Sequence, residues 1–107
     1  MQLSEVQQRF SRVEQCIDDA SSACEQSASA PQQLKESIRQ LDQRSDEARQ
    51  YFQGQDESRI RQCVNELEEL SDRALQACKQ AGNIDSKLQQ AVQQTHSELS
   101  NLKHQMG

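Results

Sequence analysis

The chain has 107 residues, a net charge of -5 and three aromatic residues. A chain of this length is expected to form a single domain, residues 1–107. Its scattered Lys and Arg residues disfavour binding to nucleic acid or to anionic membranes, because both depend on clustered positive charge. The scarcity of aromatic and β-branched residues disfavours a β-sheet protein.

Leu, Ile, Val and Phe together contribute 19 residues, less than a fifth of the chain. Such a low fraction is typical of disordered chains when the net charge is also high. Because the net charge here is mild, the spacing of the apolar residues decides between a disordered and a folded chain. No apolar run is long enough to cross a membrane and no signal pattern opens the sequence, so we expect a cytoplasmic protein.

The first apolar stripe advances in alternating steps of three and four residues. It consists of Leu3, Val6, Phe10, Val13, Ile17, Ala20, Cys24 and Ser27. This spacing predicts a helix with one buried face. The segment 27–31 (Ser-Ala-Ser-Ala-Pro) predicts the end of that helix, because Pro cannot extend a helix but fits the first turn of the next one.

The second stripe has the same spacing. It consists of Leu34, Ile38, Leu41, Ser45, Ala48 and Phe52. It predicts a second helix, and Gly54 follows at the position expected for a left-handed C-terminal cap.

The third and fourth stripes continue the pattern. They consist of Ile60, Val64, Leu67, Ser71, Ala74, Cys78 and Ala81, and of Leu88, Val92, Thr95, Leu99, Leu102 and Met106. Asp56 is the predicted N-cap of the third helix, Gly82 and Asn83 mark its predicted end, and Asp85 is the predicted cap of the fourth.

The two halves of the chain resemble each other. A shift of 54 residues places the stripe of residues 1–54 on that of residues 55–107, with Val6 on Ile60 and Phe10 on Val64. Each half is therefore a predicted helical hairpin, and short connections make consecutive helices antiparallel neighbours. The predicted fold is all-α, an antiparallel up-down-up-down four-helix bundle of two similar hairpins. Extended hairpins that associate as a dimer are the alternative.

The predicted core is thin. Beyond the capping turns, no acidic or basic residue falls on the four stripes, so charge is confined to the outside. Many stripe positions carry Ala, Ser, Thr or Cys where a stable bundle usually has Leu or Ile. The helices can approach closely, but they bury little apolar area, and association as a homodimer would bury more.

A second apolar row on the third helix is the candidate partner-binding surface. Cys63, Leu70 and Ala77 recur at heptad spacing, and Leu75 lies on the other flank. The alternative is that this row packs against a neighbouring helix of the bundle, which needs a wider stripe than a strict heptad seam.

No motif of catalysis or metal binding is present in the sequence. The four cysteines form no Cys-x-x-Cys pair, and neither histidine has Glu three residues before it. Cys24 and Cys78 are expected on diagonally opposite helices, beyond the Cα separation of about 7 Å that limits a disulfide. We therefore expect four reduced thiols, no catalytic residue, no metal and no cofactor.

Three functional hypotheses follow from these patterns. The first is a non-catalytic cytoplasmic module for protein–protein interaction, which presents a helix face or groove to a protein partner. The second is an acidic helical chaperone or anti-activator that sequesters a partner helix. The third is a thiol-based metal or redox binder.

Overall fold

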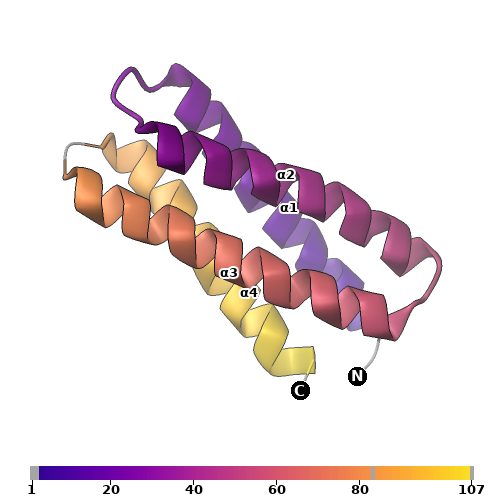
Figure 1. Cartoon of the computed structure of the whole chain (residues 1–107). Helices are drawn as coiled ribbons and strands as arrows, with labels where there is room; N and C mark the ends of the chain where they lie inside the picture. The colour runs from indigo at the N-terminus through magenta and orange to yellow at the C-terminus, as the bar shows by residue number, and fades with distance from the viewer. Residues whose placement is uncertain (1–2, 83, 107) are drawn as a thin grey trace.

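A computed structural model describes residues 3–82 and 84–106, and in these ranges the chain forms four helices. They are α1 (Leu3–Gln26), α2 (Gln32–Gln53), α3 (Glu57–Ala81) and α4 (Ser86–Met106). The helices form an antiparallel four-helix bundle with principal dimensions of 40 × 21 × 18 Å (Figure 1). This confirms the predicted fold class.

Each helix has two neighbours in the bundle. α2 packs most closely on α3, α1 packs on α4, and α3 packs on α4, whereas α1 and α2 are the least closely packed neighbours. Within the described helices, no Cα of α1 lies within 8 Å of a Cα of α3, and the same holds for α2 and α4. These two pairs are therefore diagonal, as expected for up-down-up-down topology.

The predicted stripes form the core. Every predicted stripe residue is buried except Leu3, which is half-buried, and Ala81, which is exposed in the last turn of α3. Alternating steps of three and four keep the stripe on one face of each helix. Cys16, Ser37 and the predicted row on α3 add buried positions beside the stripes.

The buried apolar residues form two clusters. The large-residue cluster contains Val6, Phe10, Val13, Ile17, Leu41, Ala48, Phe52, Ile60, Cys63, Val64, Leu67, Leu70, Leu99, Leu102 and Met106. The small-residue cluster contains Ala20, Cys24, Leu34, Ile38, Ala74, Ala77, Cys78, Leu88 and Val92. The small-residue cluster lies at the end of the bundle that holds the connections between α1 and α2 and between α3 and α4 (Figure 1).

Buried hydroxyl groups separate the two clusters along α3 and α4. Ser71 and Thr95 are almost completely buried, and each lies between the residues that its helix gives to one cluster and to the other. Ser71 Oγ donates to the carbonyl of Glu68 at 2.8 Å, and Thr95 Oγ1 donates to that of Ala91 at 2.8 Å. Both hydroxyl groups find their hydrogen-bond acceptor within their own helix, so neither links one helix to another by a hydrogen bond.

The caps of α3 match the sequence prediction. The Asp56 side chain accepts a hydrogen bond from the Arg59 backbone N–H at 3.2 Å. Gly82 ends the helix with a left-handed backbone, at a φ of 71°. Glycine adopts this conformation without the steric cost that a Cβ imposes. The other residue predicted to end the helix, Asn83, lies outside the described residues.

The left-handed residue after α2 is Gln55, so the prediction for Gly54 is wrong. Gly54 has a right-handed backbone, at a φ of -82°, and Gln55 has a φ of 57°. The Gln55 N–H donates to the Phe52 carbonyl and the Asp56 N–H to that of Tyr51, each at 3.1 Å. This pair of bonds is a Schellman motif, whose left-handed position falls one residue later than the glycine because α2 extends through Gln53.

Replacement of this strained residue is expected to stabilise the bundle. Gln55→Gly removes the cost of a left-handed backbone at a residue with a Cβ, about 1–2 kcal/mol, and glycine adds about 0.5–1 kcal/mol of unfolded-state entropy. We expect a net gain of about 0.5–1 kcal/mol in the free energy of unfolding, measured by urea denaturation. Gln53→Gly, inside the helix, is the control and should destabilise by about as much. A loss of stability in Gln55→Gly would contradict this assignment.

Candidate functional site: the groove between α1 and α2

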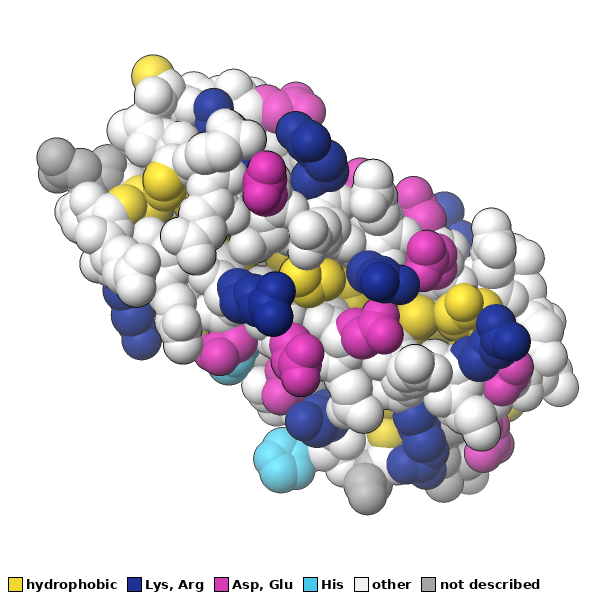
Figure 2. Space-filling view, in the orientation of Figure 1, with side chains coloured by type: hydrophobic (Ala, Val, Ile, Leu, Met, Phe, Trp, Pro, Cys, Tyr) yellow, Lys and Arg dark blue, Asp and Glu magenta, His cyan; other side chains and the backbone are white. Residues whose placement is uncertain are grey.

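The predicted partner-binding row is largely covered by the bundle itself. Cys63 and Leu70 belong to the large-residue cluster and Ala77 to the small-residue cluster, and all three are buried. Leu75 is partly buried against the small-residue cluster. Figure 2 looks onto the face formed by α2 and α3, where apolar side chains appear as separate patches among charged ones. The row therefore serves the packing of the bundle, which is the alternative that the sequence had left open.

Polar side chains surround Cys63 on this face. Arg44 forms an ion pair with Glu66 of α3 at 3.3 Å. The guanidinium of Arg59 lies over the Tyr51 ring, 5.5 Å from its centroid. The cations around Cys63 are therefore already paired within the chain.

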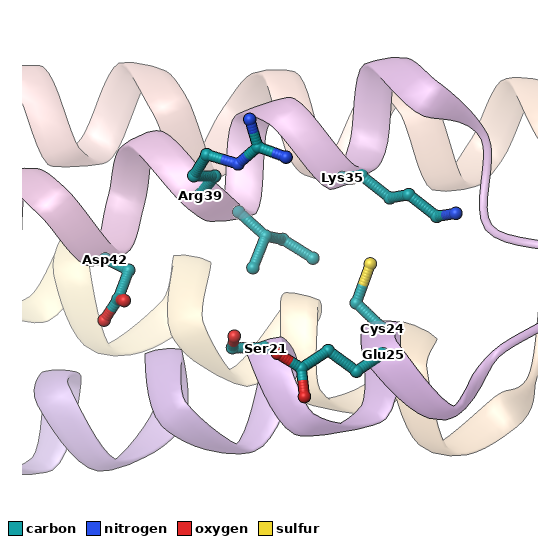
Figure 3. Close-up of a pocket in the computed structure, with 7 residues that line it drawn as sticks. Ser21, Cys24, Glu25, Lys35, Arg39 and Asp42 are labelled. Carbon is teal, nitrogen blue, oxygen red and sulfur yellow. The ribbon is translucent and has the colours of Figure 1, made fainter.

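A groove between α1 and α2 has a different character. Its volume is about 350 Å³, at the lower end of the range of about 300–1,000 Å³ that is usual for ligand pockets. It is lined by Ser21, Cys24 and Glu25 of α1 and by Lys35, Ile38, Arg39 and Asp42 of α2. We call this site the α1–α2 groove (Figure 3).

The groove opens where the core residues of α1 are small. Ala20 and Cys24 belong to the small-residue cluster, together with Ile38 on the other side of the groove. At the opposite end of the bundle the same two helices are joined by large groups. There Phe10 packs on Phe52 with ring centroids 5.0 Å apart, and Arg49 of α2 forms an ion pair with Glu14 of α1.

Both rims of the groove carry charge. Lys35, Arg39 and Asp42 follow one another along α2 at steps of four and three, so they share a helix face. In Figure 3 the Cys24 sulfur points toward α2 and the Asp42 carboxylate points toward α1, whereas the Arg39 guanidinium lies over α2 itself. Glu25 supplies a carboxylate on the α1 side.

Asp42 sits in a negative environment. Burial raises the pKa of its carboxyl above the ordinary value of 3.8, and the charges of Asp46 and Asp18 raise it further. Arg49 lowers this pKa, but by the least of these effects. The ionised carboxylate is therefore less favourable in the folded protein than in water.

All four cysteines are buried free thiols. Burial raises the pKa of each of them, and for Cys78 the nearby Cys24 raises the pKa further. Because α1 and α3 are diagonal, Cys24 and Cys78 lie too far apart for a disulfide, which typically needs a Cα separation below about 7 Å. A raised pKa keeps a thiol protonated at neutral pH and lowers its reactivity.

Side chains suited to metal binding do not converge in the described part of the chain. Across residues 3–82 and 84–106, no three His, Cys, Asp or Glu side chains are arranged to hold a metal ion. None of the described helices is long and apolar enough to cross a membrane.

No family model, curated protein or solved structure matches this chain. The groove must therefore be interpreted from its own chemistry. The sequence does contain a signal for it, since Lys35, Arg39, Asp42 and Asp46 follow one another along one side of α2. That signal marks an exposed helix face, and only the structure shows that the face borders a groove.

The raised pKa of Asp42 predicts a pH-dependent effect of Asp42→Asn. At pH 7 the variant should be more stable than the parent by about 0.2–0.5 kcal/mol, since it removes a partly buried charge and its like-charge pair with Asp46. The folded-state pKa is raised, so the penalty exists when Asp42 is ionised and disappears as the pH falls through that pKa toward 3.8. Urea denaturation at pH 7 and at about pH 3 measures the change. A gain that persists unchanged at the lower pH would contradict the assignment.

Proposed function

We propose that this protein is a non-catalytic cytoplasmic module for protein–protein interaction, and that its α1–α2 groove binds a helix of a partner protein. The observation that carries the proposal is the groove itself. It opens over Cys24 and Ile38 of the small-residue cluster, between the least closely packed neighbouring helices.

A helix is the occupant that suits this shape. Two antiparallel helices leave a linear groove, and an amphipathic helix can lay its apolar face into such a groove. The residues of α2 that line the groove run from Lys35 to Asp42, a rise of about 10 Å along the helix axis. This length matches about two turns of a bound helix. Charged rims above the buried side chains of Cys24 and Ile38 fit a stripe of small side chains flanked by polar ones.

Two observations support a role without catalysis. The only thiol that lines the groove, Cys24, has its pKa raised by burial, and no histidine is among the lining residues to act as its base. The cytoplasmic location belongs to the same proposal, since the free thiols suit a reducing compartment.

Sequestration of a partner helix is the second candidate, as in a chaperone or anti-activator. The small-residue cluster favours it, because Ala20, Cys24, Ala74 and Cys78 bury less apolar area than Leu or Ile at the same sites. A helix that fills the groove would add apolar contacts at the small-residue end of the bundle, where the chain itself buries the least apolar area. The protein should then gain stability when its partner binds.

Site-specific photocrosslinking in the native host tests the proposal. We expect benzoylphenylalanine at position 35, on the rim of the groove, to give a discrete adduct with a partner protein. The same group at Lys79, exposed on α3, serves as the control and should not give that adduct. Ser21→Trp, which fills the groove, should abolish the adduct. An adduct that forms equally from both positions, or that survives Ser21→Trp, would refute the groove as the binding site.

A further inference from the structure

The acidic residues beside the groove have few partners within the chain. In the part of the chain that the structure describes, the carboxylates of Asp42 and Asp18 form no ion pair and accept no hydrogen bond. Asp46 has only a long contact with Arg49, at 3.9 Å. Three neighbouring carboxylates from two helices therefore have little compensation within the chain.

In the described part of the chain, none of the nearby cations forms an ion pair with Asp42. Arg49 donates two hydrogen bonds to the Glu14 carboxylate, so its charge is already paired with Glu14 and not with Asp42. Arg39 precedes Asp42 by one turn, but its guanidinium lies over α2 in Figure 3 and no ion pair joins the two. Asp42 is half-buried at the groove wall, so a positive group that enters the groove would reach it in a partly dehydrated setting.

We propose that the helix bound in the α1–α2 groove carries a Lys or Arg side chain that pairs with Asp42, next to small side chains that fit between α1 and α2 above Cys24 and Ile38, which are themselves buried. This inference rests on the proposed function, since it names the chemistry of the partner at the same groove. A side-chain cation fits better than a metal ion, because the described acidic residues do not converge as ligands.

The opposite end of the groove fixes the spacing of the charges on the partner. Lys35 lies seven residues before Asp42 on α2, two helical turns away on the same face. A partner helix that places its basic residue at Asp42 can place an acidic residue at Lys35 only if the two are about seven positions apart. The expected sequence pattern is therefore one basic and one acidic residue at i and i+7, with small apolar residues at i+3 and i+4 between them.

Two synthetic peptides of about 18 residues test the inference, a length at which an amphipathic helix can form. The first carries Lys and Glu at i and i+7 around Ala at i+3 and i+4, and the second differs only by Glu in place of that Lys. Fluorescence anisotropy gives the affinity, and nuclear magnetic resonance shifts locate the site. We expect the first peptide to bind at the groove about three- to tenfold more tightly than the second.

Variants of the protein separate a specific pair from general attraction to an acidic surface. Asp42→Lys should reverse the preference between the two peptides. Asp19→Lys is the matched control, because Asp19 lies on the side of α1 that borders α4 and the change in net charge is the same. It should leave the order of the two affinities unchanged. Circular dichroism checks that both variants remain helical, and Asp42→Asn, with the milder change, should narrow the preference if Asp42→Lys does not fold.

Each other outcome has a defined meaning. Equal binding of both peptides at the groove, or the same reversal in Asp19→Lys, overturns the charge pairing and leaves the proposed function standing. Failure of both peptides to shift groove resonances overturns the inference, and the photocrosslinking experiment then decides the proposed function separately. Concentration-dependent dimerisation of the free protein that shifts groove resonances would also overturn it, because the occupant would be a second copy.

Discussion

Phe10→Ala is expected to remove a large part of the stability of the bundle. Phe10 is 1% exposed and packs on Phe52 with ring centroids 5.0 Å apart. Truncation of a buried Phe to Ala typically costs about 3–5 kcal/mol, because transfer energy is lost and a cavity remains. Domains of this kind have about 5–15 kcal/mol in total, so the variant should be close to the limit of folding. The midpoint of urea denaturation measures the loss.

The aromatic pair matters because few large residues are present. Phe10 and Phe52 are the only two phenylalanines, and both belong to the large-residue cluster, where Phe10 of α1 contacts Phe52 of α2. Leu75→Ala on α3 is the control, since Leu75 is only partly buried and should cost less than about 1 kcal/mol. A loss in Phe10→Ala no greater than that in Leu75→Ala would show that the pair does not hold α1 against α2.

The sequence was sufficient to predict the buried face of every helix. Steps of three and four residues follow from the helical repeat alone, so Val13, Leu41, Leu67 and Leu99 could be placed in the core without tertiary information. The order of the helices followed from the short connections, which leave antiparallel packing as the simple solution. These features are local, and a sequence records local constraints directly.

Features that depend on distances between helices could not be predicted in this way. The row through Cys63 and Leu70 is equally apolar whether α2 covers it or a partner does, and only the rotation of α3 relative to α2 decides. The groove likewise depends on how closely α1 approaches α2. The left-handed position at Gln55 escaped prediction because the glycine rule identifies the residue type, whereas the exact end of α2 determines the position.

The two clusters are expected to differ in local stability by at least about tenfold in amide exchange, or about 1.4 kcal/mol. On α3, the amides of Val64 and Leu67 lie in the large-residue cluster, and those of Ala77 and Cys78 lie in the small-residue cluster. The first pair should exchange only by global unfolding, and the second pair by local opening. Native-state hydrogen exchange, resolved by residue, measures both rates. Uniform protection along α3 would contradict the division, and would also argue against a role in sequestering a helix.

Thr95→Val is expected to reduce this difference by joining the two clusters. The Thr95 hydroxyl donates to the Ala91 carbonyl, which also accepts the ordinary helical N–H, so its removal leaves no buried group without a partner. The added methyl group should raise the free energy of unfolding by about 1 kcal/mol and slow the exchange of Ala77 and Cys78. The same substitution should weaken the binding of any helix whose entry requires the small-residue end to open. A more stable variant that binds the groove as tightly as the parent would show that binding needs no opening of the small-residue end beyond the groove of the native structure.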